Sequence, residues 1–262
     1  MSDLNIVNKE ARTKGRPQYH VRLKPGDVGD YVLLPGDPDR VLRIAKHLDD
    51  AQEVVFHREY RTCTGYYKGI KVSATSTGIG CPSAAIAVEE LANIGVRAVI
   101  RVGSTGALQP HLRIGDLVIS TGAMRNEGTS NFYVPPAFPA VPDHFLTHDL
   151  WEAALEFKAR RGCGVYLGLN ASDDAFYGET PEWIQKLSSY KLLNVEMEAS
   201  AIFTVAYLRG LAAGMVCAVS GNLVTDDVIY EGVNTGLVQG WEDAISVALE
   251  AIVRHHSRHA HG

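Results

Sequence analysis

Short apolar runs alternate along the chain with longer segments in which apolar residues recur every three or four positions. Buried strands are predicted at 31–35, 71–75, 98–102, 116–120, 165–170, 192–195 and 213–220. Helices are predicted at 37–48, 82–94, 148–160, 196–209 and 236–253. Strands and helices that alternate in this order are typical of the α/β class, in which helices cover the faces of a sheet.

Boundary residues support several of these elements. Asp37-Pro38 combines an N-cap residue with a proline at the first helical position, so a helix is expected to begin there. Gly95 fits the position just after the end of a helix. Residues 126–147 contain several prolines and aromatic residues and predict a long loop, which is more often functional than idle.

The composition is that of an ordinary globular protein, with 46% apolar and 21% charged residues among 262. We expect one domain over residues 1–262, with a polar arm over 1–18 and a disordered, histidine-rich tail over 254–262. The net charge of −5 argues against nucleic acid as a partner, and no apolar stretch approaches the roughly 18 residues of a membrane span. Four scattered cysteines without a CxxC pair predict neither zinc nor disulfides, and the expected location is the cytoplasm.

Two glycine-containing turns at predicted strand ends each carry an arginine. They are Gly36-Asp37-Pro38-Asp39-Arg40 and Arg101-Val102-Gly103-Ser104. Glycines let backbone N–H groups approach an anion, and a guanidinium binds phosphate oxygens with two donors. The alternative is a tight corner with a surface arginine. That alternative is weaker for Arg101, because it lies inside an apolar run, where an unpaired charge is costly.

A pair of carboxylates lies in Asn194-Val195-Glu196-Met197-Glu198. Residues two apart at a strand-to-helix junction are expected to point in different directions. One of the two carboxylates near a polyol would accept hydrogen bonds from two vicinal hydroxyls. The alternative is that the acidic residues stabilise the N-terminus of the following helix. Judged on this segment alone, that alternative is the better interpretation.

Seven segments in register resemble one known family over nearly the whole chain, from about His20 to the last helix. They are Tyr19-His20, GDPDR at 36–40, HREY at 57–60, STGIGCPS at 76–83, RVGSTGALQP at 101–110, SDDAFYG at 172–178 and NVEMEAS at 194–200. With these motifs the chain resembles the nucleoside phosphorylase-I family, and within it the uridine phosphorylase branch.

The resemblance implies a fold, a reaction and an assembly. The fold is a three-layer α/β/α sandwich around a mixed, partly barrel-like sheet. The reaction is phosphorolysis of a nucleoside: phosphate is a co-substrate, no cofactor is required, and the products are a free base and a sugar 1-phosphate. Members of this branch assemble from dimers with shared active sites into hexamers.

The resemblance also implies roles for individual residues. The phosphate is expected to contact Gly36, Arg40, Arg101, Ser104 and, from a neighbouring subunit, Arg58. The ribose is expected to contact Glu196, Met197, Glu198 and, from across the dimer interface, His20. The base is expected to contact Thr105, Gly106, Phe176, Glu179 and Asn222. Catalysis is expected to depend mainly on Arg40, Arg101 and Glu198. A potassium ion that some uridine phosphorylases hold between subunits matches Glu59, Ile79 and Ser83.

The base-binding segment departs from the family pattern. Familiar uridine phosphorylases read uracil with a Gln and an Arg in an insertion shortly after the Phe-Tyr pair, but Phe176-Tyr177 is followed here by a shorter loop. Glu179 is the nearest positional equivalent of that glutamine. Purine members carry an acidic residue where this chain has Gly221, which has no side chain to protonate a purine.

Because of these departures, the sequence is compatible with more than one substrate. Because a required general acid is missing, a pyrimidine nucleoside is favoured, with uridine first. The alternative is a purine nucleoside such as guanosine, inosine or methylthioadenosine, since a carboxylate at 179 also suits the N1–H of guanine. A hydrolytic nucleosidase is disfavoured by the arginine set. A non-catalytic nucleoside-binding protein is the remote alternative.

Overall fold

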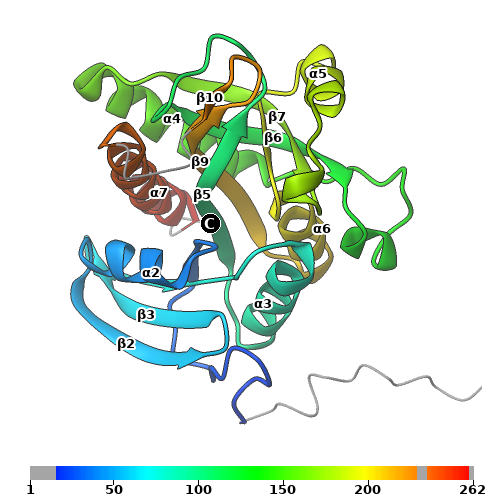
Figure 1. Cartoon of the computed structure of the whole chain (residues 1–262). Helices are drawn as coiled ribbons and strands as arrows, with labels where there is room; N and C mark the ends of the chain where they lie inside the picture. Colours follow the sequence, from blue (N-terminus) through cyan, green and yellow to red (C-terminus); the bar gives the residue numbers. More distant parts are fainter. Residues whose placement is uncertain (1–15, 229–234, 260–262) are drawn as a thin grey trace, which may run out of the picture.

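The computed structural model describes residues 16–228 and 235–259, so most of the predicted arm and the last three residues of the predicted tail lie outside the described residues. The strands are β1 (Tyr31–Leu34), β2 (Asp49–His57), β3 (Tyr60–Tyr67), β4 (Ile70–Thr75), β5 (Ala98–Ala107), β6 (Leu117–Asn126), β7 (Val165–Asp173), β8 (Asn194–Glu196), β9 (Ala212–Asn222) and β10 (Asp227–Val228). The helices are α2 (Pro38–Ala45), α3 (Cys81–Asn93), α4 (His144–Arg161), α5 (Pro181–Ser189), α6 (Ala199–Arg209) and α7 (Thr235–His259), with short 3₁₀ turns η1 (Thr129–Phe132) and η2 (Phe176–Gly178) (Figure 1). None of the described helices is long and apolar enough to traverse a bilayer.

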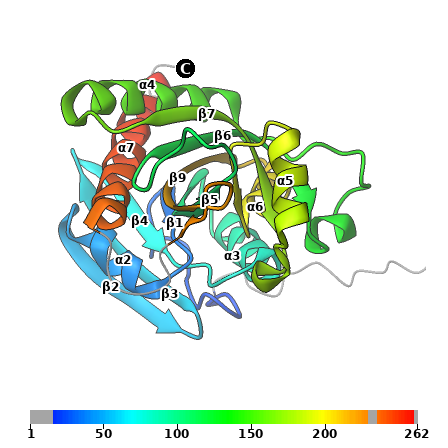
Figure 2. The ribbon, with the colours of Figure 1, turned by 45° about the horizontal axis from the view of Figure 1, so that its top comes forward.

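One mixed sheet connects all of these strands, and half of it closes into a barrel (Figure 2). β5, β9, β6, β7 and β8 pair in that order, and β8 pairs back onto β5, so these strands form a ring. The long strand β5 serves twice, because its first residues pair with β1 while Gly106 and Ala107 pair with β8. From β1 the sheet continues through β4, β3 and β2. The expected mixed, partly barrel-like sheet is confirmed.

Helices cover the sheet on both faces, which confirms the three-layer α/β/α arrangement. α2, α4 and α7 share one buried apolar cluster with the sheet, which includes Ile44, Leu150 and Ile252. α3 and α6 share a second cluster, which includes Val88 and Phe203. Burial of apolar surface, at roughly 25 cal/mol per Å², is the main force that holds each layer against the sheet. Figure 1 shows the two helix groups on opposite sides of β5 and β9.

Local signals predicted the start of α2 and the end of α3 correctly. The Asp37 carboxylate accepts a hydrogen bond from the backbone N of Asp39 over 2.9 Å, and Pro38 is the first helical residue. After α3, Gly95 has a φ of +96°, an angle that side-chain-bearing residues rarely adopt. This start of α2 fixes where Arg40 lies, in the first turn of the helix that follows β1.

Long-range pairing adds elements that the apolar pattern did not predict. β2 and β3 form an antiparallel hairpin, and β2 is mostly exposed, so no apolar run marks it. α5 is a short helix capped by Thr180, and α4 begins at His144, which shortens the predicted loop. The predicted strand over 98–102 continues to Ala107, so the expected turn at Gly103-Ser104 is wrong.

The predicted disorder of the C-terminal tail is wrong for the residues that are described. α7 continues to His259, and His255 is only 5% exposed. The Nδ1 of His255 lies 3.2 Å from one carboxylate oxygen of Asp149, and Arg258 donates to the other over 2.6 Å. These bonds fasten the end of α7 to α4, and burial lowers the pKa of His255. A histidine-rich terminus therefore packs as the end of a core helix.

Candidate active site

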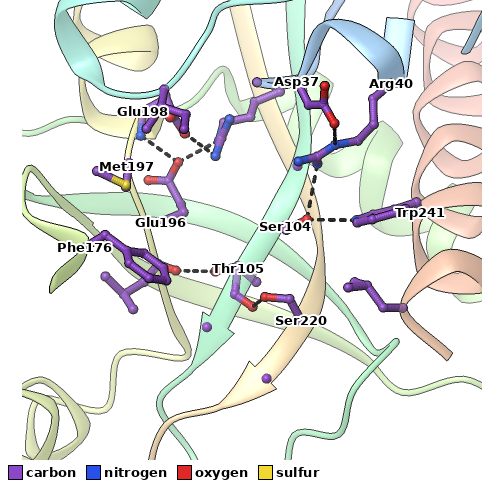
Figure 3. Close-up of a pocket in the computed structure, with 18 of the residues that line it drawn as sticks. Asp37, Arg40, Ser104, Thr105, Phe176, Glu196, Met197, Glu198, Ser220 and Trp241 are labelled. Carbon is purple, nitrogen blue, oxygen red and sulfur yellow. Dashed lines mark hydrogen bonds and ion pairs between the residues drawn. The ribbon is translucent and has the colours of Figure 1, made fainter. Parts of the chain in front are cut away.

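A cavity of about 960 Å³ lies where the barrel meets the N-terminal turns of α7 (Figure 3). Its walls come from the loop after β1, from β5, from the junction of β8 with α6, from η2 and from the end of β9. The structure brings most of the predicted site residues together here: Gly36, Arg40, Glu59, Ile79, Arg101, Ser104, Thr105, Gly106, Phe176, Glu179, Glu196, Met197 and Glu198. Segments that are more than 100 residues apart in the sequence thus share one site.

Arg101 is buried in the floor of this cavity between two carboxylates. It is 4% exposed, and its Nε lies 2.6 Å from Oε2 of Glu196, while its Nη2 pairs with Oε2 of Glu198. Burial by itself lowers the pKa of Arg101, but Glu198 and Glu196 raise it above its ordinary value. The prediction that the carboxylates at 196 and 198 point in different directions is therefore wrong, because both reach the same guanidinium.

The space that Arg101 occupies depends on a glycine two residues further along β5. A Cβ on Gly103 would lie 3.1 Å from the Cζ of Arg101 and 3.1 Å from the Sγ of Cys217. Side chains two apart on a strand share a face, so the guanidinium folds over the position that a side chain at 103 would fill. Gly103, which was expected to form a turn, instead leaves room for the Arg101 side chain.

Glu196 serves mainly as a cap and as a partner for Arg101. Its carboxylate accepts hydrogen bonds from the backbone N–H groups of Glu198 and Ala199 at 2.9 Å, and from Ser172 Oγ at 2.5 Å. With these donors and Arg101 around it, the carboxylate has little capacity left for a sugar. Glu196 therefore fits the alternative interpretation, in which an acidic residue stabilises the N-terminus of the following helix, better than the predicted contact with ribose.

Glu198 has fewer hydrogen-bond partners than Glu196 and keeps more capacity to accept from a ligand. Its Oε1 accepts a hydrogen bond from the backbone N of Gly80 over 2.7 Å, and its Oε2 pairs with Arg101. Each carboxylate oxygen has two acceptor sites, so Glu198 can still accept from further donors in the cavity. Met197 lies between the two carboxylates and also lines the cavity (Figure 3).

A second arginine shares the cavity with Arg101. Arg40 donates from Nη1 to Ser104 Oγ over 3.2 Å, and Asp37 lies 3.9 Å from its Nε. Burial and the like charge of Arg101 lower the pKa of Arg40. Nη1 of Arg101 and Nε of Arg40 are both buried without a hydrogen-bond partner among the described residues. Two cationic groups with unused donors on one cavity form a site for an anion.

The opposite end of the cavity is less charged and more apolar. Gly106, Leu223 and Phe176 line it, and Phe176 on η2 is 56% exposed. The hydroxyl of Thr105 is already engaged, because it donates to the carbonyl of Val195 over 2.6 Å. This end is suited to a flat aromatic ligand rather than to an anion.

Glu179 is the ionisable group at the apolar end. It makes no hydrogen bond within the described part of the chain, and burial, together with the negative charge of Asp173, raises its pKa to about 7. Asp173 is itself buried and accepts from Asn126 and from the indole of Trp183. Glu179 also borders a neighbouring cavity of about 790 Å³ that Lys191 and Asp226 line.

Some predicted residues lie outside the cavity. Asn222 is buried, and its amide donates to the carbonyls of Gln109 and Leu112 while accepting from two backbone N–H groups, so it has no free group for a base. His20 contacts Glu90 on α3 over 2.7 Å. Arg58 is exposed in the two-residue turn between β2 and β3, with a φ of +57°.

Of the three residues matched to a potassium site, Glu59 and Ile79 line the cavity, and Ser83 lies outside its lining beside Glu59. Ser83 donates from Oγ to Oε1 of Glu59 over 2.8 Å, and Ile79 is 78% exposed. A Cβ on Gly78 would lie 2.8 Å from Cγ of Glu59, so the turn at 78 packs tightly on this carboxylate. Among the described residues no group of three or more His, Cys, Asp or Glu side chains is arranged to hold a metal.

Sequence reasoning missed the wall of the cavity that α7 contributes. Leu237, Val238 and Trp241 line it, and Arg43 reaches it from α2. The helical spacing of apolar residues in α7 indicated a core-facing stripe, and tryptophan fits such a stripe without any signal of a site. Only the packing of α7 beside β5 reveals that part of this stripe faces a cavity.

Comparisons with known proteins agree with this geometry. This chain is similar to a uridine phosphorylase of Thermococcus kodakarensis, with 49% identity over 235 residues, which are 85% of this chain and 83% of the relative. It is similar to a guanosine phosphorylase of Halorubrum lacusprofundi, with 41% identity over 90% of this chain and 98% of the relative. A crystal structure of uridine phosphorylase from Vibrio fischeri matches with a TM-score of 0.82 and 36% identity, over 91% of this chain and 98% of that chain.

A family model gives the same assignment over most of the sequence. It matches residues 30–253, a range that contains every element from β1 to β10 and most of α7. The same range contains both arginines and both carboxylates of the cavity floor. The chain belongs to the Phosphorylase superfamily.

Proposed function

We propose that this protein is a nucleoside phosphorylase that transfers the sugar of a nucleoside to inorganic phosphate, with uridine as the favoured substrate. The observation that carries the proposal is the buried guanidinium of Arg101, which two carboxylates hold while its Nη1 has no partner in the described structure. A buried donor without an acceptor is costly, and an oxyanion in the cavity supplies the acceptor. The family and the named relatives support the same reaction.

The phosphate is proposed to lie between Arg40, Arg101 and Ser104, close to the backbone at Gly36. Burial and then the like charge of Arg101 lower the pKa of Arg40, and a phosphate between the two arginines relieves their repulsion. Arg101 cannot turn away to follow the substrate, because Glu196 and Glu198 hold two of its nitrogen atoms. A fixed donor costs no reorganisation during the reaction, which is the basis of electrostatic catalysis.

The ribose is proposed to lie above the phosphate, with its 2′- and 3′-hydroxyls on Glu198 and its ring against Met197. In the reaction the bond from C1′ to the base nitrogen breaks, its electron pair leaves with the base, and positive charge develops on the ribose ring. The phosphate anion stabilises this charge and then forms the new C1′–O bond. Glu198 keeps the sugar in position while C1′ moves from base to phosphate.

We include a neighbouring subunit in the proposed site. His20 and Arg58 lie outside the cavity, yet they lie on the same part of the surface, because the Nδ1 of His57 is 2.8 Å from the carbonyl of His20. Both residues are therefore available to a second copy of the chain. A dimer with shared sites, assembled further into a hexamer, is the arrangement proposed, with Glu59, Ile79 and Ser83 at a potassium site between subunits.

The primary test is the dependence of base release on phosphate. The purified protein is incubated with uridine, with and without phosphate, and uracil and ribose 1-phosphate are quantified. We expect release of uracil in equal amount to ribose 1-phosphate, and only with phosphate present. Base release into water without phosphate indicates a hydrolase, and nucleoside binding without release indicates a binding protein; either result contradicts the proposal.

Guanosine is the second candidate substrate, and Glu179 is the observation that favours it. An ionised carboxylate accepts from the adjacent N1–H and N2–H groups of guanine, whereas uracil presents a donor flanked by acceptors. A protonated carboxyl group, with one donor and one acceptor, suits uracil instead. One of the named relatives is a guanosine phosphorylase.

The protonation of Glu179 therefore predicts a base preference that changes with pH. Its pKa of about 7 leaves the group mainly protonated at pH 6 and mainly ionised at pH 8. The ratio of kcat/KM for uridine to that for guanosine should fall by up to about a hundredfold between these values, because the protonated fraction falls about tenfold while the ionised fraction rises about tenfold. Use of the ratio cancels the titration of phosphate, which both reactions share.

The Glu179→Gln variant is the matched control for this prediction. Glutamine resembles the protonated acid in presenting a donor on one atom and an acceptor on the other, and it does not titrate. We expect the variant to prefer uridine at both pH values with an unchanged ratio. If the ratio of kcat/KM for uridine to that for guanosine still falls with pH in this variant, a group other than Glu179 controls the base preference.

A further inference from the structure

Trp241 contacts the proposed phosphate site, although no sequence motif marks it. Its indole Nε1 donates to Ser104 Oγ over 2.8 Å (Figure 3). The guanidinium of Arg40 lies over the same ring, with Cζ 5.1 Å from the ring centroid, and Arg43 lies at 5.4 Å. One aromatic side chain from α7 thus touches both a cation and a hydroxyl that face the oxyanion.

The two hydrogen bonds at Ser104 determine what its hydroxyl can still do. A serine hydroxyl has two acceptor lone pairs and one proton. Arg40 Nη1, at 3.2 Å, and Trp241 Nε1, at 2.8 Å, are donors only, so they occupy both lone pairs. No described residue accepts the remaining proton, and Ser104 lines the cavity. The hydroxyl is left as a pure donor to a ligand in the cavity.

We propose that Trp241 is a positioning residue for phosphate: it turns the Ser104 hydroxyl into a fixed donor toward the oxyanion and holds the Arg40 guanidinium flat beside it. The inference rests on the proposed function, because it takes phosphate as the ligand. Without the indole N–H, one lone pair of Ser104 is free and the hydroxyl can rotate away. The aromatic face adds a cation–π attraction that restricts Arg40.

α7 is held firmly enough for this role. Glu242, next to Trp241, accepts from Arg43 Nη1 over 3.1 Å and lies 2.7 Å from Nε2 of His47, so α7 is tied to α2 at this level. On the other side, a Cβ on Gly240 would lie 3.0 Å from Cβ of Ala218, so the glycine lets α7 approach β9 closely. The indole is therefore carried by a helix that is fixed on both sides.

The test is the Trp241→Phe variant, which keeps an aromatic ring and removes the indole N–H. We expect KM for phosphate to rise about tenfold while KM for uridine stays unchanged, since only the orientation of a donor to the anion is lost. Phosphate titration followed by thermal shift measures the same loss without turnover: the rise in Tm at a given phosphate concentration should be smaller. A variant with the wild-type phosphate affinity overturns the proposal.

Two further variants separate positioning from a general structural effect. Glu250 lies nine residues beyond Trp241 on α7 and accepts from Tyr67 Oη and Lys68 Nζ, each over 2.6 Å. Glu250→Gln weakens this tie of α7 to the end of β3, away from Ser104, so we expect a lower Tm with an unchanged KM for phosphate. In a Ser104→Ala background, Trp241→Phe should add a much smaller increase in KM, because the residue through which it acts is gone. Equal increases in both backgrounds contradict the proposed link through Ser104.

The outcome for the proposed function is read separately, from the wild-type protein. If the wild type shows no phosphate-dependent base release, the proposed function fails whatever the variants do. If the wild type depends on phosphate and Trp241→Phe leaves the phosphate KM and the thermal shift unchanged, only the role of Trp241 is overturned.

Discussion

Replacing Arg101 by glutamine is expected to remove almost all turnover and to destabilise the fold. Glu196 and Glu198 are both buried and both paired with this guanidinium, so its loss leaves two carboxylates uncompensated. Removal of one partner from a buried ion pair costs about 3–5 kcal/mol of unfolding free energy. Because a single preorganised donor to a developing charge contributes about 10²–10³ in rate, kcat/KM should fall by about 10³ or more. Steady-state kinetics and denaturant unfolding measure the two effects.

Two companion variants keep this prediction interpretable if Arg101→Gln does not fold. Arg101→Lys retains the positive charge between the carboxylates, but an ammonium group cannot form the planar set of donors that reaches both carboxylates and an anion. It should fold and still lose about 10² in kcat/KM. The double variant Arg101→Gln/Glu198→Gln removes one charge of each sign, so it should recover stability without recovering turnover. A lysine variant with the wild-type KM for phosphate contradicts the proposed role.

The second large effect is expected for Glu198→Gln. The carboxylate is proposed to accept hydrogen bonds from the 2′- and 3′-hydroxyls, and glutamine replaces one acceptor oxygen by a donor that faces either Arg101 or the backbone N–H of Gly80. The kcat/KM for uridine should fall by about 10² or more, because sugar placement beneath the leaving base is lost. Uracil release at several uridine concentrations, with phosphate saturating, gives the value.

A substrate that lacks one hydroxyl shows whether Glu198 acts through the sugar. With 2′-deoxyuridine the wild type already lacks one of the two contacts, so the loss caused by Glu198→Gln should be smaller than with uridine. Glu182→Gln, at an exposed position on α5, is the matched control and should leave both substrates unaffected. If Glu198→Gln lowers kcat/KM equally for the two nucleosides, Glu198 acts through Arg101 or through folding and not through the sugar hydroxyls.

The two carboxylates also show where a sequence rule stopped applying. Residues two apart share a face in a strand, and their side chains point in different directions in a helix. At the junction of a strand with a helix the backbone follows neither geometry, so neither rule predicts where the two carboxylates point. β8 ends at Glu196, and Glu198 has a φ of −139° and a ψ of −25°, which is neither strand nor helix. That one turn directs both carboxylates to Arg101, and no local pattern encodes it.

The sequence by itself determined the parts of the molecule that depend on neighbouring residues. Asp37 and Pro38 start α2, Gly95 follows α3, and the apolar runs mark the buried strands, because capping, backbone angles and local burial are set within a few residues. The family motifs added candidate ligands, most of which line one cavity in the structure.

Only the tertiary structure decided which of these residues act on one another. The barrel closure that brings β8 to β5, the pairing of Arg101 with the carboxylates at 196 and 198, and the contact of Trp241 with a serine 137 residues away depend on pairing between distant segments. The burial of His255, in a terminus whose composition predicted disorder, has the same origin. The pairing of a buried charge and the direction of a hydroxyl proton are set by whatever group lies within about 3 Å in space, and spacing along the chain does not carry that information.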